Sequence, residues 1–299
     1  MKCLAALAAA ASVAFGETCS EFVESARAAY SHKQYGQAAD QFELAVRTCL
    51  FRDSLQLDLA RARFMAQEFE QATEVLRRLL AAEPRNAAAL KLQGDTLYLL
   101  GRSQEAEKAL MSAAELDPAN PEPNYALGRI YYQQSRYDEA IERLRKVLAL
   151  DPKSYRAYDN LGLAYEGLND LPNAIANYRR AMELSANAEP PYDWPYGNMS
   201  NLLHKSGDYK QAFQFGAEAA HRNPNSARNF FLTGRALAKL ERWELAAKWL
   251  GHSVTLDPKY GEARYQYSMV LRKLGRAREA DEQLAAFREI EASRTRDRR

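Results

Sequence analysis

The sequence predicts an all-α fold, an α-α superhelical solenoid of about eight helix-turn-helix repeats, from three sets of residues that recur every 34 positions apart from one four-residue slip. The alanines of this frame are Ala38, Ala72, Ala106, Ala140, Ala174, Ala212, Ala246 and Ala280. The prolines are Pro84, Pro118, Pro152, Pro224 and Pro258. The small residues are Ala26, Ala60, Gly94, Gly128, Gly162, Ser200, Gly234 and Ser268. A unit of this length cannot bury its apolar face alone, so it stacks on copies of itself.

Residues 121–154 show what each unit contains. Two stretches have apolar residues at helical spacing, and Ser135 and Arg136 lie at a turn between them. Pro152 ends the second stretch because proline cannot continue a helix. The unit is therefore predicted to be a helix, a turn and a second helix.

Glycine in the first helix of a unit needs a packing reason, because it costs up to about 1 kcal/mol relative to alanine. The repeat frame sets Gly94, Gly128, Gly162 and Gly234 opposite the alanines of the second helices. Small residues on both sides let two backbones approach closely, and a larger side chain there would overpack.

The pattern resembles the tetratricopeptide repeat family. The likeness rests on Tyr131 and Tyr165 three positions after the small residue, the alanine twelve after it, an aromatic residue or leucine four further on, and the closing proline. Gly216 departs from it, since it replaces that large residue in the sixth unit. The resemblance covers residues 19–294, and its units are 19–52, 53–86, 87–120, 121–154, 155–192, 193–226, 227–260 and 261–294.

The slip falls between Ser185 and Trp194, where prolines crowd a lengthened connection. It indicates either a hinge between the first five and the last three units or an insertion that a surface loop tolerates.

Both ends of the chain lie outside the repeats. Residues 1–16 are predicted to be a signal peptide, since Lys2 precedes an apolar core and small residues flank Phe15. The protein is then exported, to the periplasm or the extracellular space; the alternative is an uncleaved interfacial or core helix. Residues 295–299 form a basic tail.

Cys19 and Cys49 remain after removal of such a signal. In the repeat frame they lie at neighbouring ends of one helical hairpin, and exported proteins tolerate disulfides, so the pair is predicted to form one. Closing this loop contributes about 3 to 4 kcal/mol in the chain-entropy model. The alternative is two unrelated thiols.

Motifs for catalysis and metal binding are missing from the sequence. It has no phosphate-binding glycine loop, paired-histidine zinc helix or nucleophile elbow, and its four histidines are scattered over three units with no metal-ligand spacing. A net charge of +2 does not favour nucleic acid, and no later stretch reaches transmembrane length. We therefore expect no enzyme, cofactor, metal site, nucleic-acid partner or membrane span.

The resemblance implies a concave face lined by the first helices, which in this family binds peptides or extended segments of partner proteins. The residues in those positions that form the predicted groove are Arg61, Tyr98, Tyr125, Arg129, Tyr132, Arg156, Trp194, His204, Lys205, Arg228, Phe231, Arg235, Lys239 and Tyr265. Acidic residues there are fewer: Asp95, Glu122, Asp159, Glu166 and Glu262. Arginines and aromatic rings together suit a segment that carries carboxylates.

The function predicted from the sequence is a non-enzymatic scaffold for a protein or peptide partner with acidic character. Alternatives are a structural subunit of a cell-envelope assembly and a carrier for anionic glycans. The alternative interpretation of the groove is that its tyrosines are core residues and its arginines a solvated lining. The chaperone-tail clamp of the family is disfavoured, because Asp95 stands where its asparagine belongs. Partner identity, pathway and oligomeric state stay open.

The close approach of the paired helices gives a first prediction. Ala140→Leu should lower the thermal midpoint strongly, by an overpacking cost of about 1 to 3 kcal/mol, because the site has no room for a larger side chain. Replacing a turn residue such as Arg136 by leucine should change it little. Equal midpoints for the two variants, measured by circular dichroism, would contradict the packing argument.

Overall fold

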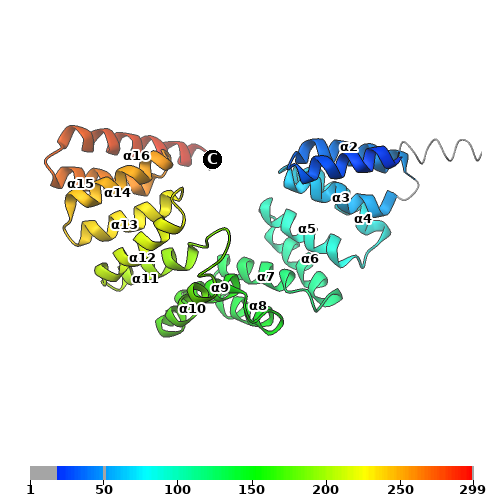
Figure 1. Ribbon diagram of the computed structural model, residues 1–299, viewed down its shortest axis with the longest axis horizontal. Coiled ribbons are helices and arrows are strands. Elements are labelled where there is room, and N and C mark those ends of the chain that lie inside the picture. Colours follow the sequence, from blue (N-terminus) through cyan, green and yellow to red (C-terminus); the bar gives the residue numbers. More distant parts are fainter. Residues whose placement is uncertain (1–18, 50–51, 298–299) are drawn as a thin grey trace, which may run out of the picture. The chain divides into compact units, whose positions relative to one another are not determined.

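A computed structural model describes residues 19–49 and 52–297, and over these ranges the chain forms helices and turns with no strand. Residues 1–16, where the signal peptide is predicted, lie outside the described residues, as does the end of the basic tail. The chain divides between Pro152 and Lys153 into two compact units, each larger than a single repeat, which we call unit 1 and unit 2. Within the described part, each unit contains four helix pairs (Figure 1). The all-α repeat fold is confirmed.

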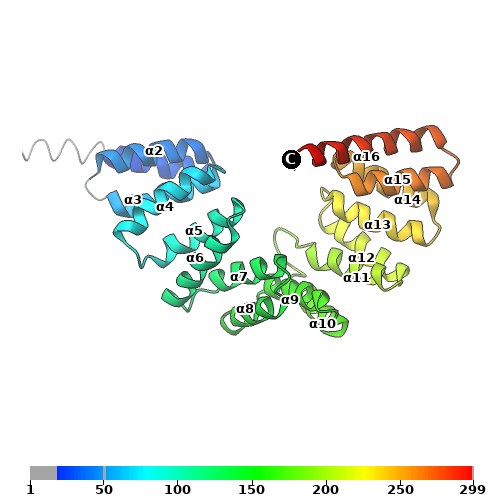
Figure 2. The same cartoon turned by 180° about the vertical axis from the view of Figure 1, so that it is seen from behind.

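Unit 1 begins with a helix over residues 19–31. Its other helices are α2 (Tyr35–Thr48), α3 (Arg52–Met65), α4 (Phe69–Ala82), α5 (Ala87–Leu99), α6 (Ser103–Leu116), α7 (Glu122–Gln133) and α8 (Tyr137–Leu150). Each helix packs on the next one along the chain from α2 to α8 (Figure 2).

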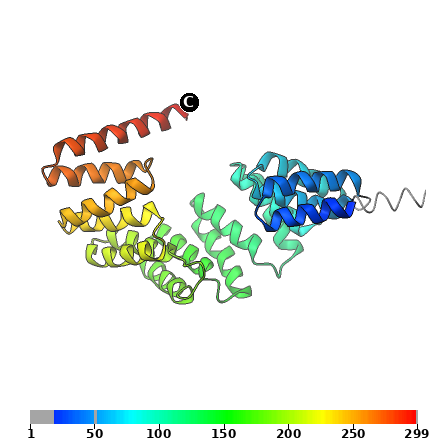
Figure 3. The same cartoon turned by 45° about the horizontal axis from the view of Figure 1, so that its top comes forward.

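Unit 2 repeats this arrangement. Its helices are α9 (Tyr155–Gly167), α10 (Leu171–Leu184), α11 (Trp194–Lys205), α12 (Tyr209–Arg222), α13 (Ala227–Lys239), α14 (Trp243–Leu256), α15 (Gly261–Lys273) and α16 (Ala277–Asp297). Helix α16 packs on α15 and, at 21 residues against 13, is the longer of the two (Figure 3).

All eight turns within the helix pairs of the described residues use one backbone device. The second residue after each first helix has a positive φ between 57° and 84°. After α5, the N–H groups of Gly101 and Arg102 donate to the carbonyls of Tyr98 and Leu97, which is the Schellman arrangement that ends a helix. The residues in this position are Lys33, Gln67, Gly101, Ser135, Asn169, Gly207, Glu241 and Gly275. Only three of them are glycine, so five pairs turn through a residue that disfavours the left-handed conformation.

In the four pairs whose first helix carries a glycine in the small position, that glycine packs chiefly against a large residue of the second helix. A Cβ on Gly128 would meet the side chain of Leu144 and come within 3.5 Å of the Ala140 carbonyl oxygen. The same relation holds for Gly94 with Leu110, Gly162 with Tyr178 and Gly234 with Leu250. The alanine opposite lets the backbones approach, as expected, and the large residue four positions later fills the space above the glycine.

The α11–α12 pair reverses these roles. Ser200 donates a hydrogen bond of 2.7 Å to the Ala212 carbonyl, and Gly216 replaces the large residue. A Cβ on Gly216 would lie 3.0 Å from the Ser200 hydroxyl and 2.9 Å from that of Thr233. The departure from the repeat pattern at Gly216 therefore accompanies tight packing.

The inserted connection over residues 185–193 belongs to unit 2 and is fastened there. Tyr192 packs against the ring of Tyr155, with centroids 4.9 Å apart, and donates a hydrogen bond to Asp159. Asp193 is buried and accepts a bond from Asn229. These contacts on both sides favour the interpretation as a tolerated insertion over the hinge.

The predicted disulfide between Cys19 and Cys49 is present, with the two Cα atoms 5.2 Å apart. It joins the start of the first helix to the end of α2. Cys49 lies in a small apolar cluster with Ala45 and Leu55, which Phe22 borders. The bridge therefore holds together the first described helix pair, which among the described residues has a stacked neighbour on one side only.

Arg136, which the sequence places at an exposed turn, has partners. It donates hydrogen bonds to Glu107 and Glu139 and lies 4.1 Å from the ring centroid of Tyr131. Replacing it therefore removes interactions. The exposed Lys108 on α6 is the better control for Ala140→Leu.

The left-handed turn residues give a second prediction. Gln67→Gly should raise the free energy of unfolding by about 0.5 to 1 kcal/mol, because glycine adopts positive φ without a Cβ clash. The same substitution at Gln71, inside α4, should lower it by a similar amount. Urea unfolding followed by circular dichroism compares the two. A loss of stability at both positions would refute the role of the turn.

Candidate functional site

The predicted groove residues fall into the two compact units and are described as two sets. Unit 1 holds Arg61, Tyr98, Tyr125, Arg129 and Tyr132. Unit 2 holds Arg156, Trp194, His204, Lys205, Arg228, Phe231, Arg235, Lys239 and Tyr265. Each set lies on the first helices of its unit.

In unit 1 the set is spread over α3, α5 and α7. The guanidinium of Arg129 lies 5.9 Å from the ring centroid of Tyr98. Tyr132 packs against Tyr137 across the turn, with centroids 5.9 Å apart. The guanidinium of Arg61 lies 3.5 Å from the carboxylate of Asp58. The tyrosines are thus partly engaged by their own unit.

In unit 2 the first helices are in contact: α11 packs on α9 and α13, and α13 on α15 (Figure 1). We call the central part of this face the α13 surface. It consists of Arg228, Arg235 and Lys239 of α13, Trp194 and His204 of α11, and Tyr265 of α15. Trp194 is 51% exposed and Tyr265 41% exposed, so both rings are available to a ligand.

The three cations of the α13 surface form no ion pair with any residue of the described ranges. Arg228 donates to the amide oxygen of Asn198 at 2.8 Å, and Arg235 to that of Asn201 at 2.9 Å. Amide partners fix an arginine without neutralising its charge. In unit 1, by contrast, Arg63 lies within 3.2 Å of three different carboxylates.

Aromatic rings support the same cations. Arg228 lies over the ring of Trp194, 5.3 Å from its centroid, and Arg235 over that of Phe231 at 5.2 Å. The structure corrects the placement of Phe231: it is 6% exposed and belongs to the core, so it supports Arg235 instead of offering a binding surface.

The neighbourhood is positive and partly dry. Burial, and then repulsion from Arg228, lower the pKa of Arg235. Burial, followed by the charges of Arg235 and Lys239, lowers the pKa of His204 to about 4, so this imidazole is neutral at pH 7. Nε of Arg235 and Nδ1 of His204 are buried without a hydrogen-bond partner among the described residues. An anion at this surface would meet positive charge from Arg235 and Lys239.

Other members of the set are differently placed. Lys205 forms an ion pair with Glu166 at 2.8 Å, and Arg156 is exposed at the start of α9. Asp159, which the sequence places among the groove residues, is buried at 2% exposure.

A buried polar network behind Arg228 is the feature that sequence reasoning missed. Asp159 accepts hydrogen bonds of 2.9 Å from the Tyr192 hydroxyl and from the Asn198 amide, whose oxygen in turn accepts from Arg228. Burial raises the pKa of Asp159 to about 6. Its members come from α9, the insertion, α11 and α13, so no local pattern in the sequence marks them.

Three family-model matches cover parts of both units. Residues 128–169 match a TPR repeat model, and residues 57–121 and 155–187 match tetratricopeptide repeat models. The chain is a tetratricopeptide repeat protein. The sequence-based resemblance is confirmed, and this tetratricopeptide repeat protein matches no curated protein.

Solved structures share the fold. A tetratricopeptide repeat protein from Parabacteroides merdae aligns with a TM-score of 0.69 and 15% identity over 85% of this chain and 99% of its own. For Pseudomonas aeruginosa pilF the TM-score is 0.59, with 24% identity over 71% and 95%. For the APC/C hetero-tetramer Cut9–Hcn1 it is 0.66, with 18% identity over 78% and 46%. At these identities the likeness shows the fold alone.

The described residues also limit the chemistry that this chain can support. They contain no group of three or more His, Cys, Asp or Glu side chains that could hold a metal ion. No helix within them has both the length and the apolar character needed to cross a membrane.

Asp159 and His204 give opposite pH dependences. With a native pKa of about 6, Asp159 binds more protons in the folded than in the unfolded state. Its contribution to the free energy of unfolding therefore falls by about 2 kcal/mol as pH rises from about 4 to 6. With a native pKa of about 4, His204 does the reverse, and stability is lost as pH falls below about 6.5.

Single variants separate the two effects. Asp159→Asn should gain stability relative to the parent protein as pH rises from 4 to 6, because the ionisation penalty is gone. His204→Asn should gain relative to the parent as pH falls over the same window. Urea midpoints measured across this range test both, and parallel profiles for variant and parent would disprove either assignment.

Proposed function

We propose that the protein is a non-enzymatic scaffold that binds an extended acidic segment of a partner protein on the α13 surface. The observation that carries the proposal is the set of three cations on α13 that have amide and aromatic neighbours and no carboxylate partner in the described part of the chain. Arginine pairs with carboxylates in a bidentate geometry. Its guanidinium is weakly hydrated, so removing its water on binding costs little free energy.

The mechanism is capture at several points on a preformed surface. Arg228 and Lys239 are 11 positions apart on α13, about three helical turns, so they can engage different side chains of one extended segment. Trp194 and Tyr265 flank them on α11 and α15 and supply apolar contact area at low entropic cost. The network through Asn198 and Asp159 holds Arg228 in place beforehand, which reduces the ordering cost of binding.

The disulfide supports export to an oxidising compartment as part of this proposal. We likewise propose that the repeat array spans residues 19–294, and that the unit 1 set contributes a second contact region through Arg129 and Tyr98.

A charge-matched pair of triple variants tests the proposal. Replacing Arg228, Arg235 and Lys239 together by glutamine should weaken binding of a fluorescein-labelled peptide that alternates Glu and Tyr by at least about tenfold, and should flatten its salt dependence. The control replaces Arg179, Lys210 and Lys248, exposed cations of the second helices α10, α12 and α14, by glutamine. It changes the net charge equally and should bind like the parent protein.

Fluorescence anisotropy at several salt concentrations measures both variants. If they bind the peptide equally well, the α13 surface is not the binding site. A peptide that alternates Lys and Tyr should bind neither the parent protein nor either triple variant.

A further inference from the structure

Unit 1 contains a pocket at its first two helix pairs that is separate from the α13 surface and shares only Arg61 with the predicted groove. It has a volume of about 270 Å³ and is lined by Arg27, Tyr30, Ser31, Phe42, Asp58 and Arg61. These residues come from the helix over residues 19–31, α2 and α3. The volume is that of one large side chain or one small molecule.

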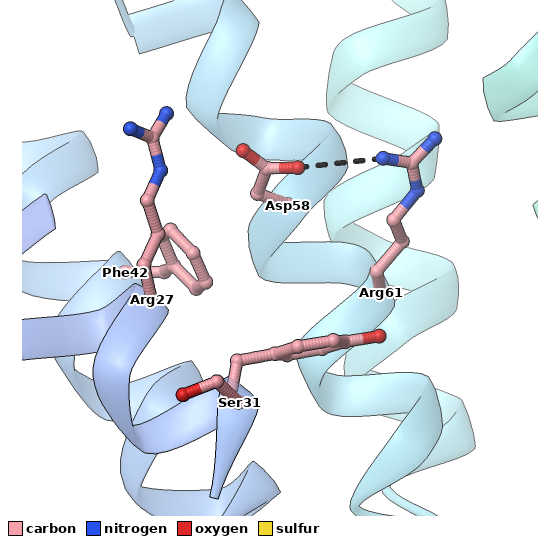
Figure 4. Close-up of a pocket in the computed structure, with 6 residues that line it drawn as sticks. Arg27, Ser31, Phe42, Asp58 and Arg61 are labelled. Atoms are coloured by element: carbon pink, nitrogen blue, oxygen red, sulfur yellow. Dashed lines mark hydrogen bonds and ion pairs between the residues drawn. The ribbon is translucent and has the colours of Figure 1, made fainter. Parts of the chain in front are cut away.

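The pocket has apolar walls and a charged mouth. Phe42 is 3% exposed, and the Tyr30 ring is braced by Tyr35 at a centroid distance of 5.2 Å. Figure 4 shows Arg27 and Arg61 on opposite sides, with the Asp58 carboxylate between them and directed toward Arg61. An apolar group can therefore enter between two guanidinium groups.

The charges of the mouth are only partly compensated. Arg27 has no ion pair or hydrogen bond through its side chain to any described residue. The Arg61–Asp58 pair has a donor–acceptor distance of 3.5 Å, at the limit of a hydrogen bond, and Arg61 is about half exposed. Two cations and one carboxylate leave one positive charge, which favours an anionic ligand.

We propose that this pocket binds an N-acylated aromatic amino acid. The ligand carboxylate accepts hydrogen bonds from Arg27, its amide N–H donates to Asp58, and its ring lies against Tyr30 and Phe42. The amide donor distinguishes this ligand from a simple aromatic acid. Asp58 repels the carboxylate of both, but only the amide N–H forms a hydrogen bond with Asp58 that offsets this repulsion. The ligand is taken up as a free small molecule; the same chemical group also ends a peptide chain.

The site does not rest on the α13 surface, since it lies in the other compact unit and uses different residues. Failure of either proposal therefore leaves the other untouched.

Isothermal titration of the full chain with N-acetyl-L-phenylalanine tests the assignment. We expect saturable binding, weakened by about tenfold or more in Arg27→Gln, because a charge-assisted hydrogen bond is lost. N-acetyl-L-phenylalaninamide lacks the negative charge, so the parent protein should bind it about tenfold more weakly than the acid. The affinity of this amide should be the same for the parent protein and for Arg27→Gln. Arg77→Gln on α4, which removes an exposed arginine outside the pocket, should bind like the parent.

Asp58→Asn supplies a second, opposite signature. It frees Arg61 and removes the repulsion, so phenylacetate should bind more tightly to this variant than to the parent protein. A peptide ending in a free phenylalanine carboxylate that binds more tightly than N-acetyl-L-phenylalanine would show that the pocket takes chain ends and not free molecules. Lack of saturable binding, or equal binding of the acid and the amide to the parent protein, would overturn the proposal.

Discussion

The close approach of the two helices of each pair is the constraint on which the structure depends. In four of the eight described pairs a glycine of the first helix lies under a leucine or tyrosine of the second, and no Cβ would fit there without displacing that side chain. The buried alanine four residues earlier keeps the backbones close. These contacts lie within one repeat, and the α11–α12 pair reverses their roles without losing the close approach. Pairs then stack through nearest neighbours.

This division of tasks leaves the first helices free to carry polar side chains. Their packing requirement is met by one small residue and its neighbours. The second position of a repeat can therefore be Trp194 on α11 and Arg228 on α13 without disturbing the pair. Unit 2 uses this freedom to place Arg228 and Arg235 of α13 beside amides and Lys239 over the ring of Tyr209. A carboxylate partner would stabilise them in the free protein but would compete with an acidic ligand.

The buried network around Asp159 shows how such a surface is kept rigid. The carboxylate is buried at a cost that raises its pKa, and it holds Tyr192 of the insertion and Asn198 of α11. Asn198 then orients Arg228. Through these contacts the inserted connection contributes to the stability of the face instead of loosening it.

The 34-residue frame by itself determined the helix pairs, the position of the tight contacts and the family, because these depend on spacings within one repeat. It also indicated the cysteine pair, whose members lie at adjacent ends of one hairpin. Only the tertiary structure decided that Phe231 is core, that Asp159 is buried, and that Arg136 is tied to Glu107. Residues in equivalent positions of different repeats meet different neighbours, and the sequence cannot distinguish an exposed cation from a paired one until the helices that supply those neighbours are in place.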